Sequence, residues 1–311
     1  MKKNKKKNSK LISYSFVTFF ILIIFLSVII LFFGIIKTPN DDNIAYNEGT
    51  TYYEQVDIKN IKSSENKDDS VGKSNFAVLQ NPQEKKEERA KKSICIIIDD
   101  YGYQDTSSIL MNLPFKISVS ILPGLTYSKS GFEMFANSKN ITPMLHIPME
   151  SINQYAQSEK DEIKTKDDKN EIERKLDLFF SQIPASFANN HMGSKVSLNQ
   201  NTIKIILDYL SKKGIRFIDS HTINNSLFVP IGKSLGYPIF ENNLFLDYNS
   251  EEDLPDKEFI KGLNLLKTRD FIIIIGHNTK EQTIKFLEKL ASMHFFHDYE
   301  FITVRELFEK Y

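Results

Sequence analysis

The stretch Ile94-Cys95-Ile96-Ile97-Ile98-Asp99-Asp100-Tyr101-Gly102 decides how the rest of the chain is interpreted. Five apolar residues run directly into two adjacent carboxylates and a glycine. A short apolar run that ends in a turn signal predicts a fully buried strand of a parallel sheet. Asp99 and Asp100 then fall at the carboxyl end of that strand, where α/β folds place their functional groups. Strand alternation predicts that the two carboxylates point in different directions and hold separate roles, although a turn with a helix cap explains the same residues.

Strand and helix patterns alternate from residue 93 onward. Apolar residues recur at helical spacing between the strands, as at Ile172, Leu176 and Phe179. The strand candidates are 94–98, 115–122, 141–147, 186–190, 215–219, 237–240 with 244–247, and 271–276. Repeating units of this kind predict one parallel α/β domain over residues 93–311, as either an open sheet or an irregular barrel.

The amino terminus has the pattern of a membrane anchor. Residues 1–10 carry six lysines, and residues 11–36 carry no charge. As a helix, residues 11–36 would span roughly 39 Å, which exceeds the roughly 30 Å hydrocarbon core. No small-residue cleavage site follows, which favours an uncleaved signal anchor. The lysines predict a single-pass protein of the cytoplasmic (inner) membrane, with its amino terminus inside and its globular domain on the periplasmic, extracytoplasmic side.

The stretch after the predicted anchor has the composition of a linker. Residues 37–92 hold 21 charged residues of both signs among 56 and little apolar periodicity, which predicts a disordered tether. Residues 11–311 carry a net charge of −6, which argues against nucleic acid as a partner. The single cysteine, Cys95, excludes an internal disulfide and is expected to be a small buried apolar residue.

Polar side chains follow several predicted strands. Because parallel strands end at one rim, these side chains are expected to converge. One carboxylate with two imidazoles is a ligand set for Zn²⁺ or a similar cation, with a position left for water. A second carboxylate can accept a proton from that water, and a further histidine can protonate a leaving group. For any one histidine, a packed or hydrogen-bonded side chain is the alternative. The residues concerned are Asp99, Asp100, His146, His191, His221 and His277.

With these residues in place, the chain resembles the divergent polysaccharide deacetylase family over about residues 94–308. Members are bacterial envelope proteins distantly related to chitin and peptidoglycan deacetylases. The resemblance rests on Ile-Ile-Asp-Asp-Tyr-Gly (97–102), Ile-Leu-Pro-Gly (121–124), Leu-His-Ile-Pro-Met-Glu (145–150), Asn-Asn-His-Met-Gly-Ser (189–194), Phe-Ile-Asp-Ser (217–220), Phe-Leu-Asp (245–247) and Ile-Gly-His (275–277).

The resemblance implies a distorted (β/α) barrel of about seven parallel strands and a metal-dependent deacetylase. The implied substrates are N-acetylated sugars of an envelope polysaccharide such as peptidoglycan. By position, Asp99 would be the base and His277 the acid. The ligands of a divalent metal, with zinc favoured, would be Asp100, His146 and His191.

Four more residues are expected to contact the substrate or to support the site: Glu150, Asn190, Asp219 and His221. The family usually has arginine where His221 stands, which bears on substrate preference. A different class of function fits the same chain. In that alternative, the domain is an inactive deacetylase-fold module that binds a glycan or an envelope protein.

Overall fold

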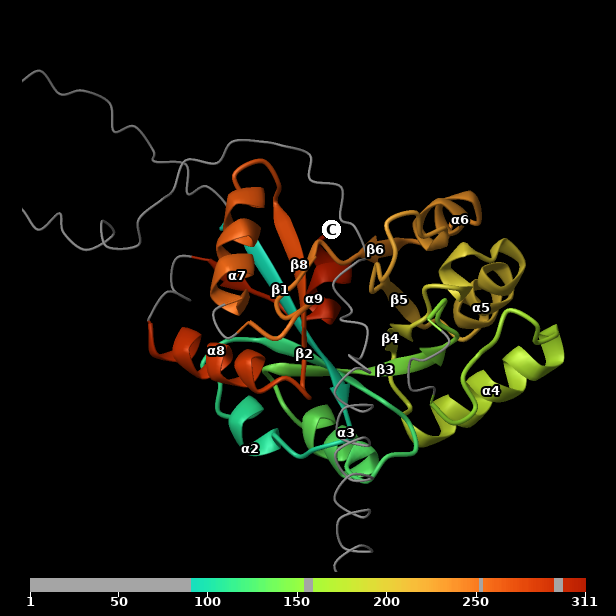
Figure 1. The fold of residues 1–311 in the computed structure, drawn as a ribbon, viewed down its shortest axis with the longest axis horizontal. Helices are drawn as coiled ribbons and strands as arrows, with labels where there is room; N and C mark the ends of the chain where they lie inside the picture. The colour runs from blue at the N-terminus through green and yellow to red at the C-terminus, as the bar shows by residue number, and fades with distance from the viewer. Residues whose placement is uncertain (1–90, 154–158, 252–253, 294–298) are drawn as a thin grey trace, which may run out of the picture. The chain divides into compact units, whose positions relative to one another are not determined.

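The computed structural model describes residues 91–153, 159–251, 254–293 and 299–311, all within one compact unit. Among those residues, nine strands form one sheet (Figure 1). The strands are β1 (Ser93–Tyr101), β2 (Ile117–Ile121), β3 (Ile141–Met149), β4 (Phe187–Met192), β5 (Arg216–Asp219), β6 (Ile239–Glu241), β7 (Leu244–Phe245), β8 (Phe271–His277) and β9 (Glu300–Phe301). The parallel α/β class is confirmed, and each predicted strand overlaps an observed one.

The strand order makes the sheet a half-barrel. Its path is β6-β5-β4-β3-β2-β1-β8-β7, every pair is parallel, and β9 adds to β1. The two ends of this path, β6 and β7, are separated in the chain by Asn242 and Asn243 alone. The Asn242 N–H donates to the carbonyl of Asp219 on β5 at 2.9 Å, and the Asn243 N–H donates to that of Ile273 on β8 at 3.0 Å. This connection, called the seam below, joins the two edges where no strand ladder does.

Helices connect the strands, and all of those described except the last cover the convex face of the sheet. They are α2 (Ser107–Leu110), α3 (Ser128–Ala136), α4 (Lys169–Gln182), α5 (Gln200–Lys212), α6 (Phe228–Ser234), α7 (Leu254–Leu265), α8 (Glu281–Ser292) and α9 (Val304–Lys310). The buried face of α4 contains Ile172, Leu176 and Phe179, as their spacing predicts. Asp168 caps this helix by accepting a hydrogen bond from the Glu171 N–H.

Successive apolar residues of β1 pack alternately into two separate apolar clusters, one on each face of the sheet. Ile96 and Ile98 of β1 belong to the larger cluster, which lies between the sheet and the surrounding helices. Cys95 and Ile97 belong to the smaller one, here called the inner cluster, on the concave face. Helix α9 contributes Val304 to the inner cluster. The Val304 N–H also donates to Ser118 Oγ of β2 at 2.9 Å, so α9 closes the amino-terminal end of the half-barrel.

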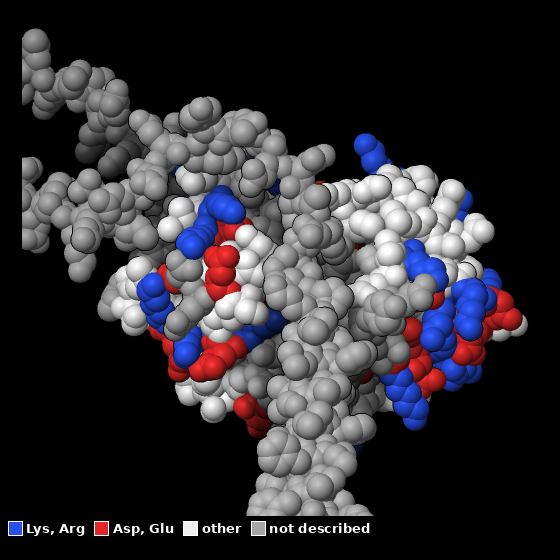
Figure 2. Space-filling model, viewed as in Figure 1, with Lys and Arg blue, Asp and Glu red and all other residues white. Residues whose placement is uncertain are grey.

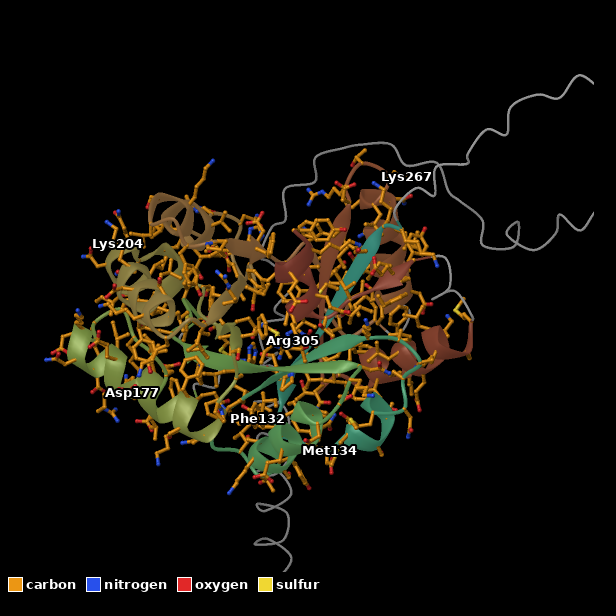
Figure 3. All side chains as sticks on the ribbon, turned by 180° about the vertical axis from the view of Figure 1, so that it is seen from behind. Phe132, Met134, Asp177, Lys204, Lys267 and Arg305 are labelled. Carbon is orange, nitrogen blue, oxygen red and sulfur yellow. The ribbon has the colours of Figure 1, made fainter. Side chains whose placement is uncertain are left out.

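The outer faces of the helices are charged, with both signs interspersed. Figure 2 shows mixed blue and red side chains over the helices on the visible face. On α4, for example, Arg174 pairs with Glu171 at 2.8 Å. Seen from behind in Figure 3, Asp177 on α4, Lys204 on α5 and Lys267 point away from the body of the domain. Opposite charges a turn apart on a helix contribute only a few tenths of a kcal/mol, so stability comes from the two apolar clusters.

The predicted tail (1–10), anchor (11–36) and most of the predicted linker (37–92) lie outside the described residues. Within the described part of the chain, no helix combines the length and apolar character needed to cross a bilayer.

Tyr101, which follows Asp100, is fixed by close packing against α3. Its ring lies edge-on to Phe135 with centroids 4.9 Å apart, and its hydroxyl donates to Asp105 Oδ1 at 2.9 Å. Gly131 of α3 leaves the space for this ring. A Cβ at that position would lie 2.1 Å from Tyr101 Cε1.

Gly131→Ala is therefore expected to destabilise the domain. Alanine gains up to about 1 kcal/mol over glycine inside a helix, but displacing a buried ring costs about 1–3 kcal/mol. Urea denaturation should show a net loss in the free energy of unfolding, while Lys129→Ala on the exposed face of α3 should change it little. Equal or higher stability for Gly131→Ala would contradict this packing.

Candidate active site

A layer of polar side chains lies next to the inner cluster, toward the carboxyl ends of the strands. It forms because the next side chain on the same face of a strand comes two residues later. Inward-facing apolar residues at Ile97, Met144, Phe187 and Ile275 are followed on their own strands by polar ones. The polar residues in this next layer are Asp99 on β1, His146 on β3, Asn189 on β4 and His277 on β8, and His191 follows on the same face two residues further along β4. The structure thus brings together predicted site residues from four strands.

Asp100 joins this layer because the backbone of β1 departs from regular geometry there. Its φ is 62°, in the left-handed region, and the register with β2 shifts between Ile98 and Tyr101. Such a bulge turns a side chain that would otherwise face the helices. Asp99 Oδ2 and Asp100 Oδ1 consequently lie 3.6 Å and 3.3 Å from the same atom, His146 Nε2. The prediction that alternation separates the two carboxylates is therefore wrong.

Asp100, His146 and His191 form a cluster with the geometry of a metal-binding site. One ligand atom from each lies within 4.8 Å of the others, and His191 Nδ1 is 3.0 Å from Asp100 Oδ1. Asp100 Oδ1 is buried, yet no described residue partners it in hydrogen-bonding geometry, and the same holds for His191 Nε2. A buried carboxylate oxygen facing two imidazole nitrogens is the arrangement that a divalent cation satisfies. These three residues fit such an ion.

The two adjacent carboxyl groups have opposite electrostatic environments. Burial raises the pKa of Asp99 above its ordinary value, although His146 and His277 act in the other direction. Burial would also raise the pKa of Asp100, but the imidazoles of His146 and His191 outweigh it and hold this pKa well below its ordinary value. Asp100 is therefore the firmly ionised member of the pair, and Asp99 is the one that takes up a proton more readily.

Asn189 lies between Asp99 and His146. Its amide Nδ2 donates to Asp99 Oδ1 at 2.9 Å and to Oδ2 at 3.1 Å. Its Oδ1 lies 2.7 Å from His146 Nδ1 and also accepts from the Ser120 hydroxyl. Sequence reasoning singled out Asn190 instead. The alternation of side chains along β4 could have identified Asn189, because residues two apart share a face of a strand. Asn189 therefore shares a face with His191, and Asn190 does not.

His277 is held by a carboxylate that sequence reasoning used only as a landmark. Asp247 Oδ1 lies 2.7 Å from His277 Nδ1, and Asp247 Oδ2 accepts from the His277 backbone N–H at 2.7 Å. The Thr283 hydroxyl donates to the same Oδ2. Burial would lower the pKa of His277, but the hydrogen bond to Asp247 outweighs it and raises the pKa to about 9. His277 is therefore cationic at neutral pH. Its Cα is the register partner of Asp99.

Glu150 and Asn190 form hydrogen bonds with the segments that follow the carboxyl ends of the strands. Glu150 accepts hydrogen bonds from the backbone and hydroxyl of Thr165 and from Lys195 Nζ at 2.7–2.9 Å. Burial would raise the pKa of Glu150, but the hydrogen bond from Lys195 and those from Thr165 outweigh it and lower this pKa to about 2. Asn190 Oδ1 accepts from the Ser220 N–H, and its Nδ2 donates to the Met192 carbonyl. Neither side chain makes a described hydrogen bond to the metal-binding cluster.

Asp219 and His221 lie where β5 ends. Asp219 is buried, which raises its pKa, and its Oδ1 accepts from the His221 N–H at 2.8 Å. Its Oδ2 has no partner among the described residues. His221 has a φ of 56° and lies 3.4 Å from the carbonyls of Asn242 and Asn224 through its two ring nitrogens. His221 therefore adjoins the seam.

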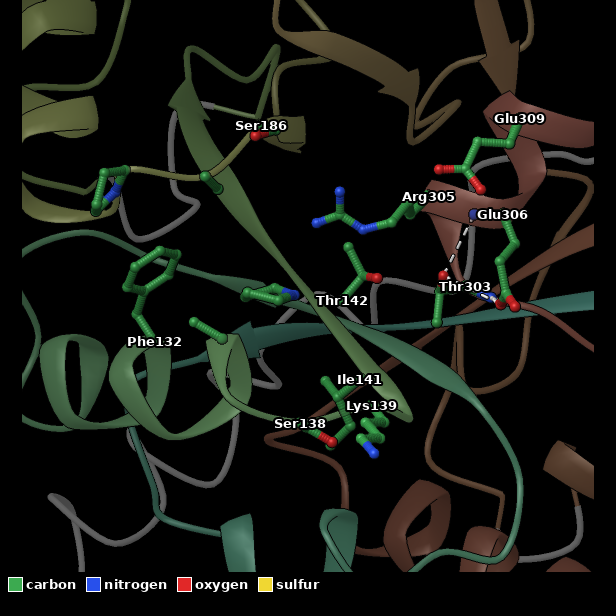
Figure 4. Close-up of a pocket in the computed structure, with 14 residues that line it drawn as sticks. Phe132, Ser138, Lys139, Ile141, Thr142, Ser186, Thr303, Arg305, Glu306 and Glu309 are labelled. Atoms are coloured by element: carbon green, nitrogen blue, oxygen red, sulfur yellow. Dashed lines mark hydrogen bonds between the residues drawn. The ribbon is translucent and has the colours of Figure 1, made fainter.

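A hollow of about 490 Å³ lies at the opposite end of the strands from this site (Figure 4). It is lined by the start of β3 at Ile141 and by Arg305 and Glu309 of α9. At its edge Thr303 and Glu306 form the capping box of α9. These contacts stabilise the start of a helix and place no cluster of metal ligands in the hollow.

The fold and site together define a parallel α/β half-barrel with a candidate metal-binding site at the carboxyl ends of its strands. The model of the family described as divergent polysaccharide deacetylase matches residues 96–308. This match covers more than half of the chain, and the chain belongs to that family. The predicted family resemblance is confirmed.

The proteins that are similar to this chain include two curated proteins and a solved structure. YibQ of Escherichia coli (strain K12), an uncharacterised protein, is 26% identical over 200 residues, which are 64% of this chain and 62% of YibQ. An uncharacterised protein of Haemophilus influenzae is 25% identical over 201 residues, 60% of this chain and 67% of that protein. The match therefore spans less than two thirds of YibQ. The crystal structure of the uncharacterised protein ATU2773 from Agrobacterium tumefaciens C58 shares the fold, with a TM-score of 0.65 at 16% identity, covering 70% of this chain and 89% of that one.

The Asp247–His277 pair predicts a specific pH dependence of stability. A histidine whose pKa rises from 6.5 to about 9 on folding stabilises the fold fully below pH 6.5, and this contribution is lost as the pH rises through 9. In Asp247→Asn the pKa of His277 should fall toward 6.5. Urea denaturation in the presence of a chelator should then show a smaller loss of stability between pH 6.5 and pH 10 than in the unchanged protein.

Asp270→Asn is the matched control, because Asp270 is exposed at the other end of β8. It should preserve the loss seen in the unchanged protein. An equal loss in Asp247→Asn and the unchanged protein would show that this carboxylate does not set the pKa of His277.

Proposed function

We propose that this protein is a metal-dependent deacetylase that hydrolyses N-acetyl groups on sugars of an envelope polysaccharide. The observation that carries the proposal is the joint presence, at one rim, of a ligand cluster, a carboxylate beside it and a cationic histidine. The ligands are Asp100, His146 and His191, and zinc is the proposed metal. A divalent cation held by these ligands supplies Lewis-acid activation of an amide carbonyl and of water.

Asp99 is the proposed general base. Its Oδ2 lies 3.6 Å from His146 Nε2, so it borders the ligand cluster. Its raised pKa makes it a better proton acceptor than an exposed aspartate, because catalytic efficiency rises as the pKa of the base approaches the working pH. Asp99 would take the proton of the water that attacks the acetamide carbon.

His277 is the proposed general acid. Asp247 holds its Nδ1, which leaves Nε2 as the atom that can deliver a proton. The raised pKa of about 9 keeps the imidazole charged before the reaction. Transfer of its proton to the amide nitrogen lets the amine leave as the C–N bond breaks. Asp99 and His277 are register partners on β1 and β8, and together they provide the base and the acid that amide hydrolysis needs.

The family supports an N-acetylated glycan as the substrate, with peptidoglycan as the first candidate. Glu150, Asn190, Asp219 and His221 are proposed to shape the rim around it. The hydrogen bonds of Glu150 and Asn190 fix the loops after β3 and β4. His221 is partly exposed beside the seam and is the one of the four proposed to contact the sugar directly.

Two neighbouring substitutions separate metal binding from proton transfer. Asp100→Ala should abolish stoichiometric Zn²⁺ binding with little change in the circular dichroism spectrum, because it removes a ligand. Asp99→Asn should retain Zn²⁺ and lower the rate of acetate release by about 10²–10⁴-fold, because it removes the base. Metal content by mass spectrometry and acetate release from chitooligosaccharides and peptidoglycan fragments measure the two effects in the full-length protein.

Full Zn²⁺ occupancy in Asp100→Ala would overturn the ligand assignment. No acetate release by the unchanged, zinc-loaded protein across the glycan panel would overturn the enzyme proposal and favour the non-catalytic binding module. Equal turnover by Asp99→Asn and the unchanged protein would exclude Asp99 as the base.

We also propose that residues 11–36 anchor the protein in the cytoplasmic membrane and that the domain lies on the extracytoplasmic side. The lysines of residues 1–10 and the uncharged span support this orientation. Cys95 is fully buried, so a new surface cysteine can report the topology. In Lys267→Cys, a membrane-impermeant maleimide should label the protein in intact spheroplasts, with the unchanged protein as the unlabelled control. Labelling only after lysis would place the domain in the cytoplasm.

A further inference from the structure

Asn189 contacts both the metal-binding cluster and the proposed base through its side-chain amide. It is fully buried on β4, and its amide reaches side chains of three other strands. These are Asp99 on β1, Ser120 on β2 and His146 on β3. Both polar atoms of the amide are therefore used.

The chemistry of Asp99 determines which way this amide points. An ionised carboxylate only accepts hydrogen bonds, so the atom that faces it must be the NH₂ group. Nδ2 is placed there, within 3.1 Å of both carboxylate oxygens. The amide oxygen must then face the other way, where Ser120 donates to it.

The direction of the amide in turn determines the tautomer of His146. Asn189 Oδ1 only accepts, and it lies 2.7 Å from His146 Nδ1, so Nδ1 carries the hydrogen. In the neutral imidazole, Nε2 is then left with a free lone pair. Nε2 is the atom directed at the carboxylates, 3.3 Å from Asp100 Oδ1. This is the state in which a histidine binds a metal ion.

We propose that Asn189 is the positioning residue of this site, which makes Nε2 of His146 the metal-binding atom by relaying the orientation of Asp99 through its amide. An uncharged amide suits this place because a carboxylate would oppose both Asp99 and Asp100, which already share the rim. The inference rests on the metal-binding part of the proposed function and not on turnover.

Zn²⁺ affinity of the full-length protein, measured by competition with a chromogenic chelator, tests the proposal without any substrate. Asn189→Leu removes the acceptor for His146 Nδ1 and should weaken Zn²⁺ binding about 10–100-fold. Ser120→Ala leaves the contact between Asn189 and His146 in place and should cause a smaller loss than Asn189→Leu.

Asn137→Leu is the matched control. It makes the same change at an exposed residue that follows α3, whose amide donates to the Glu133 carbonyl and not to the cluster. Its Zn²⁺ affinity should match that of the unchanged protein. An Asn189→Leu variant that folds and binds Zn²⁺ as tightly as the control would overturn the proposal.

Nitrogen-15 NMR of the unchanged, zinc-loaded protein gives a test that does not depend on the folding of any Asn189 variant. The His146 signals, identified by their loss in His146→Gln, should show hydrogen on Nδ1 and metal on Nε2. Hydrogen on Nε2, or metal on Nδ1, would overturn the proposed relay. Failure of acetate release with these results intact would refute the enzymatic proposal alone.

Discussion

The left-handed backbone at Asp100 is the constraint on which the proposed active site depends. With extended geometry, the Asp100 side chain would face the apolar cluster under the helices, where an ionised carboxylate is strongly disfavoured. The bulge turns it to the concave face beside Asp99. A non-glycine residue in this region costs on the order of 1–3 kcal/mol, and such strain concentrates at functional sites. Met192 and His221 have the same backbone conformation just beyond the site residues of β4 and β5.

Two supporting side chains give two similar imidazoles different properties. Asp247 places a negative charge against Nδ1 of His277, which favours the cationic imidazole and raises its pKa to about 9. Asn189 offers His146 the same hydrogen-bond geometry without a formal charge. The amide therefore fixes a tautomer without adding a further negative charge beside the two aspartates. The type of partner on Nδ1, more than the position of the ring in the fold, separates the proposed proton donor His277 from the proposed ligand His146.

Much of this arrangement could be predicted from the sequence because parallel strands end at one rim. That rule predicted from the sequence that Asp99, His146, His191 and His277 lie close together. The alternation rule gave the wrong direction for the Asp100 side chain, because the residue pattern around Asp100 does not predict the bulge. Asn189 was accessible through strand parity alone. Strand β9 has only two residues and carries no periodic signal, so its place beside β1 follows from tertiary packing.

The seam at Asn242 and Asn243 joins the two edges of the sheet through the chain itself, because no strand ladder pairs β6 with β7. Backbone hydrogen bonds tie Asn242 to Asp219 and Asn243 to Ile273, and the Asn243 side chain accepts a further one from the Ile273 N–H at 2.8 Å. A link of two residues keeps the edges β6 and β7 close together, so the half-barrel is closed covalently on the side where hydrogen bonding between strands stops. His221, which lies 3.4 Å from the Asn242 carbonyl, therefore stands on the covalently closed side of the rim, whereas Asp99, His146 and His277 stand on strands that ladders join.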